Sequence, residues 1–236
     1  MAVNRLSLKL KKKWTQFRFQ PIRVYIFHQV SDEYEPETMW ECDWTQTEQF
    51  KRNVLALKKK YLFVSLQEVH KHLSNDKFRI KKYAALTSDD GWASLKNIVP
   101  WLAELEIPIT LFLNPCYMDG KHFQSRSTEK FLTVDEVKTM VEDYAPYVTI
   151  ASHGWMHADS TKMSRQEFEE NVTKSEAFLK DIPGKIPFYA FAYGRQKYSQ
   201  SEWLFEHSLI PVFANDWKNY NNTSCIHREL LDGKVI

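Results

Sequence analysis

Two short stretches of the chain carry side chains that can do hydrolytic chemistry. In the first, LTSDDGW, Asp89 and Asp90 stand side by side; in the second, ASHGWMHAD, His153 and His157 are four positions apart. That histidine spacing would place both imidazoles on one side of a helical turn, close enough to share one metal ion.

Two histidines and one carboxylate make the ligand set of a catalytic zinc site, which has three protein ligands and an open position for water. Each stretch also has an ordinary explanation, because Asp-Asp-Gly is typical of a turn and an HxxxH spacing can arise by chance among eight histidines. Together they predict a metal site in which one aspartate binds the ion and the other accepts a proton from water. We expect Gly91 to supply the turn that lets the two carboxylates differ in role.

The elements that must position these residues alternate along the chain. Short apolar runs predict strands at 23–28, 61–65, 82–88, 107–113, 147–152, 187–193 and 210–215. Amphipathic runs predict helices at 46–60, 66–73, 93–105, 133–144, 164–180 and 199–208. Thr133 with Glu136, and Ser164 with Glu167, predict capping boxes at the start of two of these helices.

Alternating strands and helices indicate a parallel sheet with helices outside it, either doubly wound or closed as a barrel. His28, the Asp89–Asp90 pair, His153 and Tyr193 each stand at the end of a different predicted strand. A doubly wound sheet gathers its site at one switch point, whereas a barrel collects residues from the carboxyl ends of many strands. This distribution favours the barrel.

Composition limits the remaining possibilities. The net charge of +2 gives no sign of nucleic-acid binding, and three cysteines without a CxxC pair indicate neither a disulfide framework nor a cysteine zinc site. We expect a basic N-terminal segment, residues 1–20, followed by one domain, residues 21–236. Without a recognisable signal peptide the expectation is a cytoplasmic protein, whose basic segment either contacts the inner face of the membrane or is simply solvated.

At its motifs the chain resembles the NodB-homology polysaccharide deacetylases, also called carbohydrate esterase family 4. TSDDG corresponds to the family's T-F-D-D-G motif and HGWMH to its H-[ST]-x-x-H motif. The resemblance implies that Asp89 is the general base and that Asp90, His153 and His157 hold one divalent metal ion, zinc with Co, Ni or Fe as alternatives. It also implies a distorted (β/α)7 TIM-like barrel.

Further roles follow from the same resemblance. YAFAYG corresponds to the family's F-A-Y-P-Y-G motif, which implies that the backbone amide of Tyr193 helps to hold the oxyanion. The general acid is a histidine, either His28 after the first strand or His227, which resembles a late family histidine; a surface histidine is the alternative for each. Asp216 resembles the family's late Asp-Trp, the alternative being an ordinary loop aspartate.

The chain departs from the family at four positions: Ser88 replaces the usual Phe, Gly154 a Ser or Thr, Ala192 a proline, and Ala190 stands where many members have an Arg that orients the base. Arg195 or Arg228 could take over that orienting role. The candidate substrate-binding residues are Trp92, Trp155, Arg195, Arg228 and Asp216, with barrel packing as the alternative for both tryptophans.

The sequence therefore predicts a metal-dependent deacetylase that hydrolyses the N-acetyl group of an amino sugar, in a polysaccharide or in a lipid- or nucleotide-linked precursor of a surface glycan. Two alternatives stay open. One is a deformylase of a formamido sugar, which differs by a single methyl group in the substrate. The other is a carbohydrate-binding homologue without turnover, suggested by the altered positions beside the motifs.

Overall fold

The structure is a computed structural model that describes residues 22–34, 44–75, 81–118, 131–214, 219 and 225–231. The predicted basic segment, residues 1–20, and Asp216 lie outside these residues. Among the described helices, none combines the length and the apolar composition that crossing a membrane requires.

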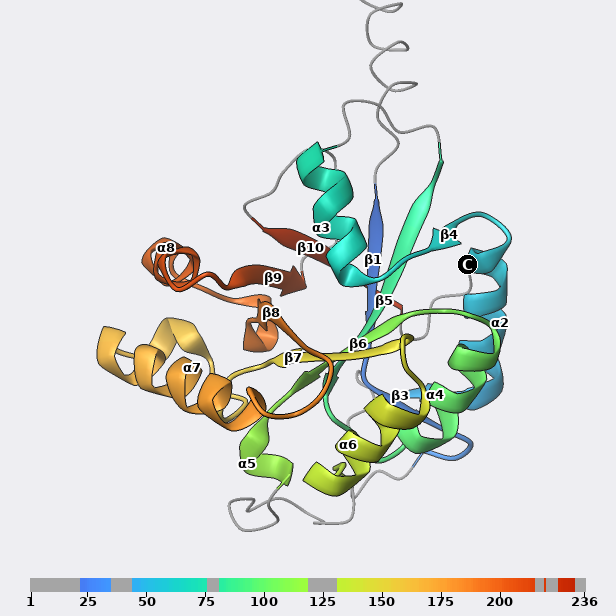
Figure 1. The fold of residues 1–236 in the computed structure, drawn as a ribbon, viewed down its shortest axis with the longest axis horizontal. Coiled ribbons are helices and arrows are strands. Elements are labelled where there is room, and N and C mark those ends of the chain that lie inside the picture. The colour runs from blue at the N-terminus through green and yellow to red at the C-terminus, as the bar shows by residue number, and fades with distance from the viewer. Residues whose placement is uncertain are drawn as a thin grey trace, which may run out of the picture.

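Seven parallel strands close into a barrel, which confirms the predicted (β/α)7 architecture (Figure 1). In ring order they are β1 (Arg23–Phe27), β5 (Tyr83–Asp90), β6 (Ile109–Leu113), β7 (Val148–Ser152), β8 (Lys185–Ala190), β9 (Ile210–Ala214) and β10 (Ile226–Leu230). The first strand, β1, closes the ring because it pairs with both β5 and β10.

The prediction of seven strands was right in number but not in membership. The predicted strand 61–65 is only β4 (Leu62–Phe63), a two-residue strand that pairs with the first residues of β5 outside the ring. The seventh barrel strand is β10. Its sequence, IHREL, has three polar or charged residues between two apolar ones and therefore lacks the apolar run that marks the other strands. The charged Arg228 of β10 is buried against Thr87 and Asp89, which lie far away in the sequence.

Every predicted helix has an observed counterpart: α2 (Thr47–Lys58), α3 (Leu66–Asn75), α4 (Leu95–Glu104), α6 (Val134–Asp143), α7 (Arg165–Leu179) and α8 (Tyr198–Glu206). Both predicted capping boxes form, at Thr133 and at Ser164. A short helix α5 (Pro115–Met118) and a small sheet of β2 (Gln29–Ser31) and β3 (Trp44–Gln46) were not predicted. In Figure 1, α2, α4 and α6 lie along one side of the barrel and α7 and α8 along the other.

Two buried clusters separate the inside of the barrel from its outside. The inner cluster contains Val24, Ala85, Phe112, Ala151 and Val212, and the outer one contains Phe27, Leu86, Leu111 and Ile150. Because successive strand residues point to opposite faces, Thr87 and Asp89 face the inside, whereas Ser88 faces the helices. Apolar residues of α3 join the inner cluster beside the start of β1 and β5 (Figure 1), so the end of the barrel opposite the catalytic motifs is filled.

Candidate active site

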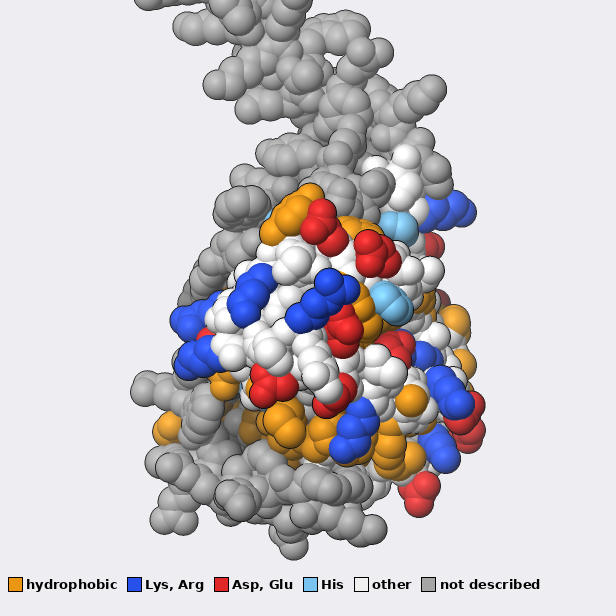
Figure 2. All heavy atoms as spheres, turned by 90° about the vertical axis from the view of Figure 1, so that its left-hand side faces the viewer, with side chains coloured by type: hydrophobic (Ala, Val, Ile, Leu, Met, Phe, Trp, Pro, Cys, Tyr) orange, Lys and Arg blue, Asp and Glu red, His pale blue; other side chains and the backbone are white. Residues whose placement is uncertain are grey.

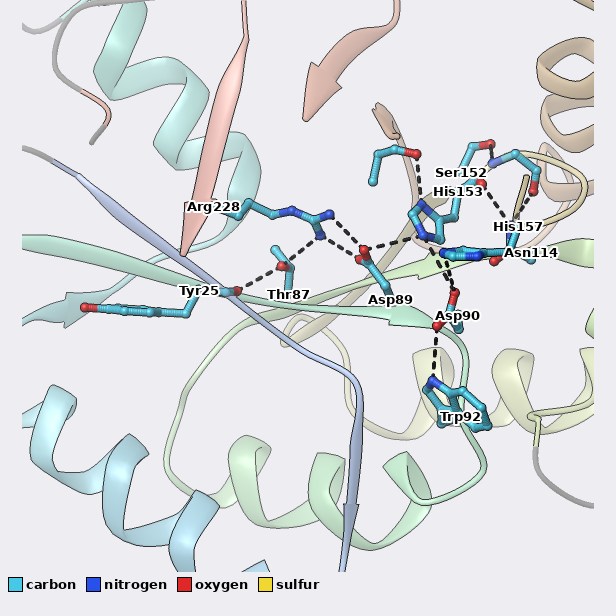
Figure 3. Close-up of polar contacts among 12 residues, drawn as sticks. Tyr25, Thr87, Asp89, Asp90, Trp92, Asn114, Ser152, His153, His157 and Arg228 are labelled. Atoms are coloured by element: carbon cyan, nitrogen blue, oxygen red, sulfur yellow. Dashed lines mark hydrogen bonds and ion pairs between the residues drawn. The ribbon is translucent and has the colours of Figure 1, made fainter. Parts of the chain in front are cut away.

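The two aspartates at the end of β5 point in different directions because the backbone turns between them. Asp90 has a φ of 68° and Gly91 a φ of 78°, so the turn starts one residue earlier than the predicted position at Gly91. A side chain at Gly91 would also approach Leu113 Cδ2 to 2.8 Å. Asp89 therefore faces the interior, and Asp90 faces the histidines that follow β7 (Figure 3).

His153 and His157 stand on a loop after β7 and not on the helical turn that the spacing suggested. The loop is fixed by Asn114, whose amide donates hydrogen bonds to the carbonyls of His153 (2.8 Å) and Gly154 (3.0 Å). The two imidazole centroids are nevertheless 5.1 Å apart. The rings thus meet as predicted, but through a loop held by a neighbouring strand end.

The ring of His153 is oriented by the backbone of β8. Its Nδ1 lies 2.9 Å from the carbonyl oxygen of Ala190, and since a carbonyl only accepts, Nδ1 carries the proton. Nε2 is then the free lone pair, and it points to the two aspartates. Burial lowers the pKa of the His153 imidazole below its ordinary value, which keeps the ring neutral, the state that binds metals.

Asp90, His153 and His157 each offer a ligand atom, and the three atoms lie within 4.8 Å of one another. Asp90 Oδ1 is 3.7 Å from Nε2 of either histidine, and it is buried with no hydrogen-bond partner among the described residues. The other oxygen, Oδ2, accepts a hydrogen bond from Trp92 Nε1 at 3.2 Å. Two imidazoles and one buried oxygen without a partner fit a divalent ion of the zinc class.

Asp89 is held by Arg228 through two parallel hydrogen bonds, of 2.6 Å from Nη1 to Oδ1 and 2.8 Å from Nη2 to Oδ2 (Figure 3). Burial by itself would raise the pKa of the Asp89 carboxyl. The Arg228 guanidinium, together with His153 and His28, outweighs burial and holds this pKa well below its usual range. Asp89 is therefore an ionised carboxylate in a fixed orientation.

Two roles were predicted for Arg228: to orient the base and to bind substrate. Its position fits the first role. It is fully buried behind Asp89, and its Nη1 also donates to Thr87 Oγ1, which in turn donates to the carbonyl of Tyr25. This burial argues against Arg228 as a substrate-binding residue, and its contact with Asp89 fits the role of orienting the base. The other candidate for that role, Arg195, pairs with Asp159 at 3.5 Å.

The two candidate general acids lie on different sides of the barrel wall. His28 directly follows β1, is half-buried, and is near enough for its charge to lower the pKa of Asp89. His227 neighbours the inward-facing Arg228 on β10 and so points outward, where its Nε2 lies 3.4 Å from Cys225 Sγ and its ring 5.8 Å from that of Phe213. Strand alternation turns His227 away from the site, which argues against it as the general acid.

The tryptophans also separate. Trp155 is buried, its ring contacts Phe178 edge-on, and Lys174 Nζ lies 3.8 Å from the ring centroid. It therefore packs against α7, as the alternative of barrel packing expected. Trp92 donates to Asp90 and stacks on Phe131 with centroids 4.4 Å apart. Its ring therefore lies beside Asp90, the candidate metal ligand, and a substrate contact of Trp92 stays a prediction.

Tyr193 lies at the rim, in a strained turn. Its φ is 57°, its side chain is half-exposed, and its ring meets His157 edge-on with centroids 4.5 Å apart. The following Gly194 is required, because a Cβ there would lie 2.5 Å from the carbonyl oxygen of Ala214. The turn thus fixes the Tyr193 backbone beside a proposed ligand; the role of its amide stays a prediction.

The departures from the family pattern have structural explanations at two positions. Ser88 is fully buried and faces the outer helices, so it does not contact substrate. At Gly154, with a φ of 84°, a Cβ would lie 2.5 Å from Asn171 Nδ2 and 3.1 Å from the Tyr189 hydroxyl. Asn171 and Tyr189 therefore fill the space that a Ser or Thr would need.

Sequence reasoning missed two residues that shape the site. Asn114 directly follows β6, so the strand-end rule that found the others could have found it. Tyr117, on α5, is in hydrogen-bonding contact with the backbone of His157, and burial followed by the nearby Asp90 charge raises the pKa of its phenol. No sequence pattern marks Tyr117, because α5 is short and lies between two predicted elements.

Comparison with known proteins agrees with this architecture. Residues 77–206, more than half of the chain, match the family model described as polysaccharide deacetylase. No curated protein matches the chain.

Several solved structures share the fold at low sequence identity. A polysaccharide deacetylase from Bacillus cereus superposes with a TM-score of 0.73 at 17% identity, over 90% of this chain and 65% of that one. The deacetylase PplD from Streptococcus pyogenes, in complex with acetate, gives 0.74 at 19% identity, over 89% and 92%. A de-N-acetylase from Aggregatibacter actinomycetemcomitans gives 0.73 at 18%, over 92% and 97%. The chain thus spans about two thirds of the Bacillus protein and nearly all of the other two.

Proposed function

The chain belongs to the polysaccharide deacetylase family, and from this premise we propose that it is a metal-dependent hydrolase that removes the N-acetyl group of an amino sugar. The substrate would be a polysaccharide or a lipid- or nucleotide-linked precursor of a surface glycan. The acetate in the complex of the Streptococcus pyogenes deacetylase, a protein of the same fold, is the acyl product that such a reaction releases.

One observation carries the proposal. Asp90 Oδ1, buried and without a partner among the described residues, lies between two histidine nitrogens, and the ionised Asp89 is 3.5 Å from one of them. Neither an ordinary turn nor core packing requires two carboxylates and two imidazoles to converge at one end of a barrel. A hydrolytic centre gives each group a task.

A divalent ion held by Asp90, His153 and His157 would supply Lewis acidity towards the amide carbonyl and towards water. Asp89 would take the proton of the attacking water, because it is ionised and Arg228 fixes both of its oxygens. Arg228 itself only orients the base, since its guanidinium is fully buried behind the carboxylate.

The leaving amine needs a proton donor on the side of the sugar. We assign this to His28, because it neighbours Asp89 at the open end of the barrel whereas His227 faces away. The developing negative charge on the carbonyl oxygen would be held in part by the backbone amide of Tyr193, whose turn is rigidly set by Gly194.

The test combines metal analysis with a product assay. Protein loaded with zinc should release acetate and free amine from N-acetylglucosamine oligomers, and a chelator should abolish the release. His153→Ala should lose both the ion and the activity, while His207→Ala, a matched change at an exposed histidine on the far end of α8, should lose neither.

Two outcomes would contradict the proposal. Release of formate from N-formyl sugars without release of acetate would replace it with a deformylase. Stoichiometric zinc and sugar binding with no release of either acid would indicate the carbohydrate-binding homologue.

A further inference from the structure

A surface pocket of about 560 Å³ opens directly beside the candidate metal site. His157 and Tyr193 line it, so the pocket is continuous with the proposed reaction centre. Its size falls in the range of roughly 300–1,000 Å³ that small-molecule sites occupy. A group attached to the reacting sugar would enter this pocket while the acyl group lies at the ion.

The pocket walls are bonded to each other. Ser160 Oγ donates to the carbonyl of Arg195 at 2.7 Å, and the Gln200 amide donates to the carbonyl of Ser160 at 2.8 Å. Lys197 Nζ donates to the carbonyl of Met163 at 2.8 Å. These contacts join the loop after His157 to the turn after β8, so the lining residues are held before a ligand arrives.

Both carboxylates of the pocket are already engaged. Asp159 Oδ1 accepts hydrogen bonds from the Thr161 amide (3.0 Å) and hydroxyl (2.6 Å). Glu167 Oε2 accepts from the Ser164 amide at 2.7 Å in the capping box of α7. Their acceptor capacity serves the local backbone, and this reduces what they offer to a ligand.

The two cations of the pocket are far less engaged. The Arg195 side chain is 67% exposed and makes one contact, at 3.5 Å, with Asp159 Oδ2. The Lys162 side chain is exposed, and its charge acts on the nearby Asp159 carboxylate. The pocket therefore presents two exposed cations, each weakly engaged with Asp159, beside the candidate reaction centre.

We propose that this pocket binds an oxyanion, the carboxylate or phosphate of a group attached to the amino sugar, through Lys162 and Arg195. The inference rests on the proposed deacetylase function and narrows its substrate to acidic glycans or phosphorylated precursors. Guanidinium and ammonium groups bind such oxyanions with charge-assisted hydrogen bonds. The face that carries α7 and α8 mixes both signs of charge (Figure 2), so the selectivity is local to the pocket.

The test compares three substrates with the zinc-loaded enzyme. These are neutral N,N′-diacetylchitobiose, a disaccharide of N-acetylglucosamine and glucuronic acid, and N-acetylglucosamine 1-phosphate. One of the anionic substrates should have a kcat/KM at least about tenfold above that of the neutral one, since a hydrogen bond to a charged group contributes that much. The anionic substrate with the higher kcat/KM shows whether the pocket binds a carboxylate or a phosphate.

Variants assign the effect to the pocket. Lys162→Ala and Arg195→Ala should each lower the ratio of anionic to neutral kcat/KM by about tenfold, and Lys162→Glu should lower it further. Lys180→Ala removes the same charge from the other end of α7 and should leave the ratio unchanged. A ratio near one in the unaltered enzyme, or a ratio insensitive to both pocket variants, would overturn the inference while the deacetylase function stood.

If no substrate is hydrolysed, calorimetric titration still tests the oxyanion pocket separately from the deacetylase function. The proposed function then fails, and titration of the glucuronate disaccharide and of N-acetylglucosamine 1-phosphate into the same protein tests the pocket. Binding of either that weakens at least about tenfold in Lys162→Ala supports the pocket. Absence of binding by both, or binding unchanged in Lys162→Ala, overturns it.

Discussion

The candidate site has an inner half and an outer half that are built differently. In the inner half, Asp89, His153 and Arg228 have side chains that are at most 4% exposed, and each is held by at least one short polar contact. In the outer half, the His157 side chain is 18% exposed and the Arg195 side chain 67%, and few contacts restrain Arg195. Both halves nevertheless adjoin the same proposed ion, because His157 is a candidate ligand and also lines the outer pocket.

The difference separates two kinds of requirement. The inner half fixes a charge and a ring direction inside a low-dielectric barrel, where a small displacement would leave a buried charge without its partner. The outer half keeps its donors accessible, as a surface that must select among incoming groups does. On this proposal, the inner half carries out the hydrolysis and the outer half selects the substrate.

The largest expected effect comes from the ligands that join the halves. Asp90→Ala should lose the bound ion and at least roughly 10³-fold in kcat/KM, because the ion supplies several kcal/mol of charge stabilisation. Metal content by mass spectrometry and amine release measure both. Asp135→Asn, an exposed aspartate of α6, is the control; full activity in metal-free Asp90→Ala would remove the ion from the reaction.

Within the inner half, Asp89→Asn should keep the ion and lower kcat by about 10²–10⁴-fold, since only the proton acceptor is lost. The expected split, metal retained and turnover lost, distinguishes a base from a ligand. Near-normal kcat in Asp89→Asn would show that another group accepts the proton.

Arg228→Met tests whether the inner half depends on its buried pair. Removing one partner leaves the Asp89 carboxylate buried without its partner, so the free energy of unfolding should fall by about 3–5 kcal/mol. Urea denaturation measures this. Adding Asp89→Asn should recover much of the loss, and strictly additive losses would argue against a coupled pair.

Gly154→Ser, which restores the residue usual in the family, should lower the free energy of unfolding by about 1–3 kcal/mol, because φ is 84° and Asn171 lies in the way. Thermal denaturation with metal bound measures it. Asn171→Ala in the same background should recover the steric part; a Gly154→Ser protein as stable as the parent would contradict the assigned clash.

The smallest effects belong to the outer half. Tyr193→Phe should change kcat/KM by less than about twofold, since the proposed oxyanion contact is made by the backbone, and Tyr193→Ala should mainly raise KM. A large fall in kcat for Tyr193→Phe would assign its hydroxyl to the reaction.

The sequence predicted the reactive residues of the site better than it predicted the residues that hold them in place. Asp89, Asp90 and His153 were found because each ends a strand whose apolar pattern is clear, and parallel strands bring those ends together. The strand that carries Arg228 was not recognised, and Arg228 was only one of two candidates to orient the base. Nothing local indicates that a charged residue will be buried opposite a carboxylate 139 positions earlier. Because the strand was missed, the direction of the His227 side chain, which the family resemblance had suggested as general acid, was not predicted.

The loop geometry was equally hidden. An HxxxH spacing satisfies a helical turn, but here the carbonyls next to His153 are held by Asn114 from the neighbouring strand end, a tertiary contact without a local signal. The same applies to Gly154, whose positive φ could be guessed from glycine alone but whose neighbours Asn171 and Tyr189 could not.

Closure of the ring by its first and last strands has a consequence for synthesis of the protein. Asp89 and Arg228 stand on the two strands that flank β1, so the ribosome makes the carboxylate long before its guanidinium partner. Until β10 emerges, the nascent barrel is open along β1, and its inward-facing aspartate is hydrated. Contacts between residues far apart in the sequence form slowly. The Asp89–Arg228 pair therefore cannot form before β10 has been made, and a fragment ending before β10 would lack this pair.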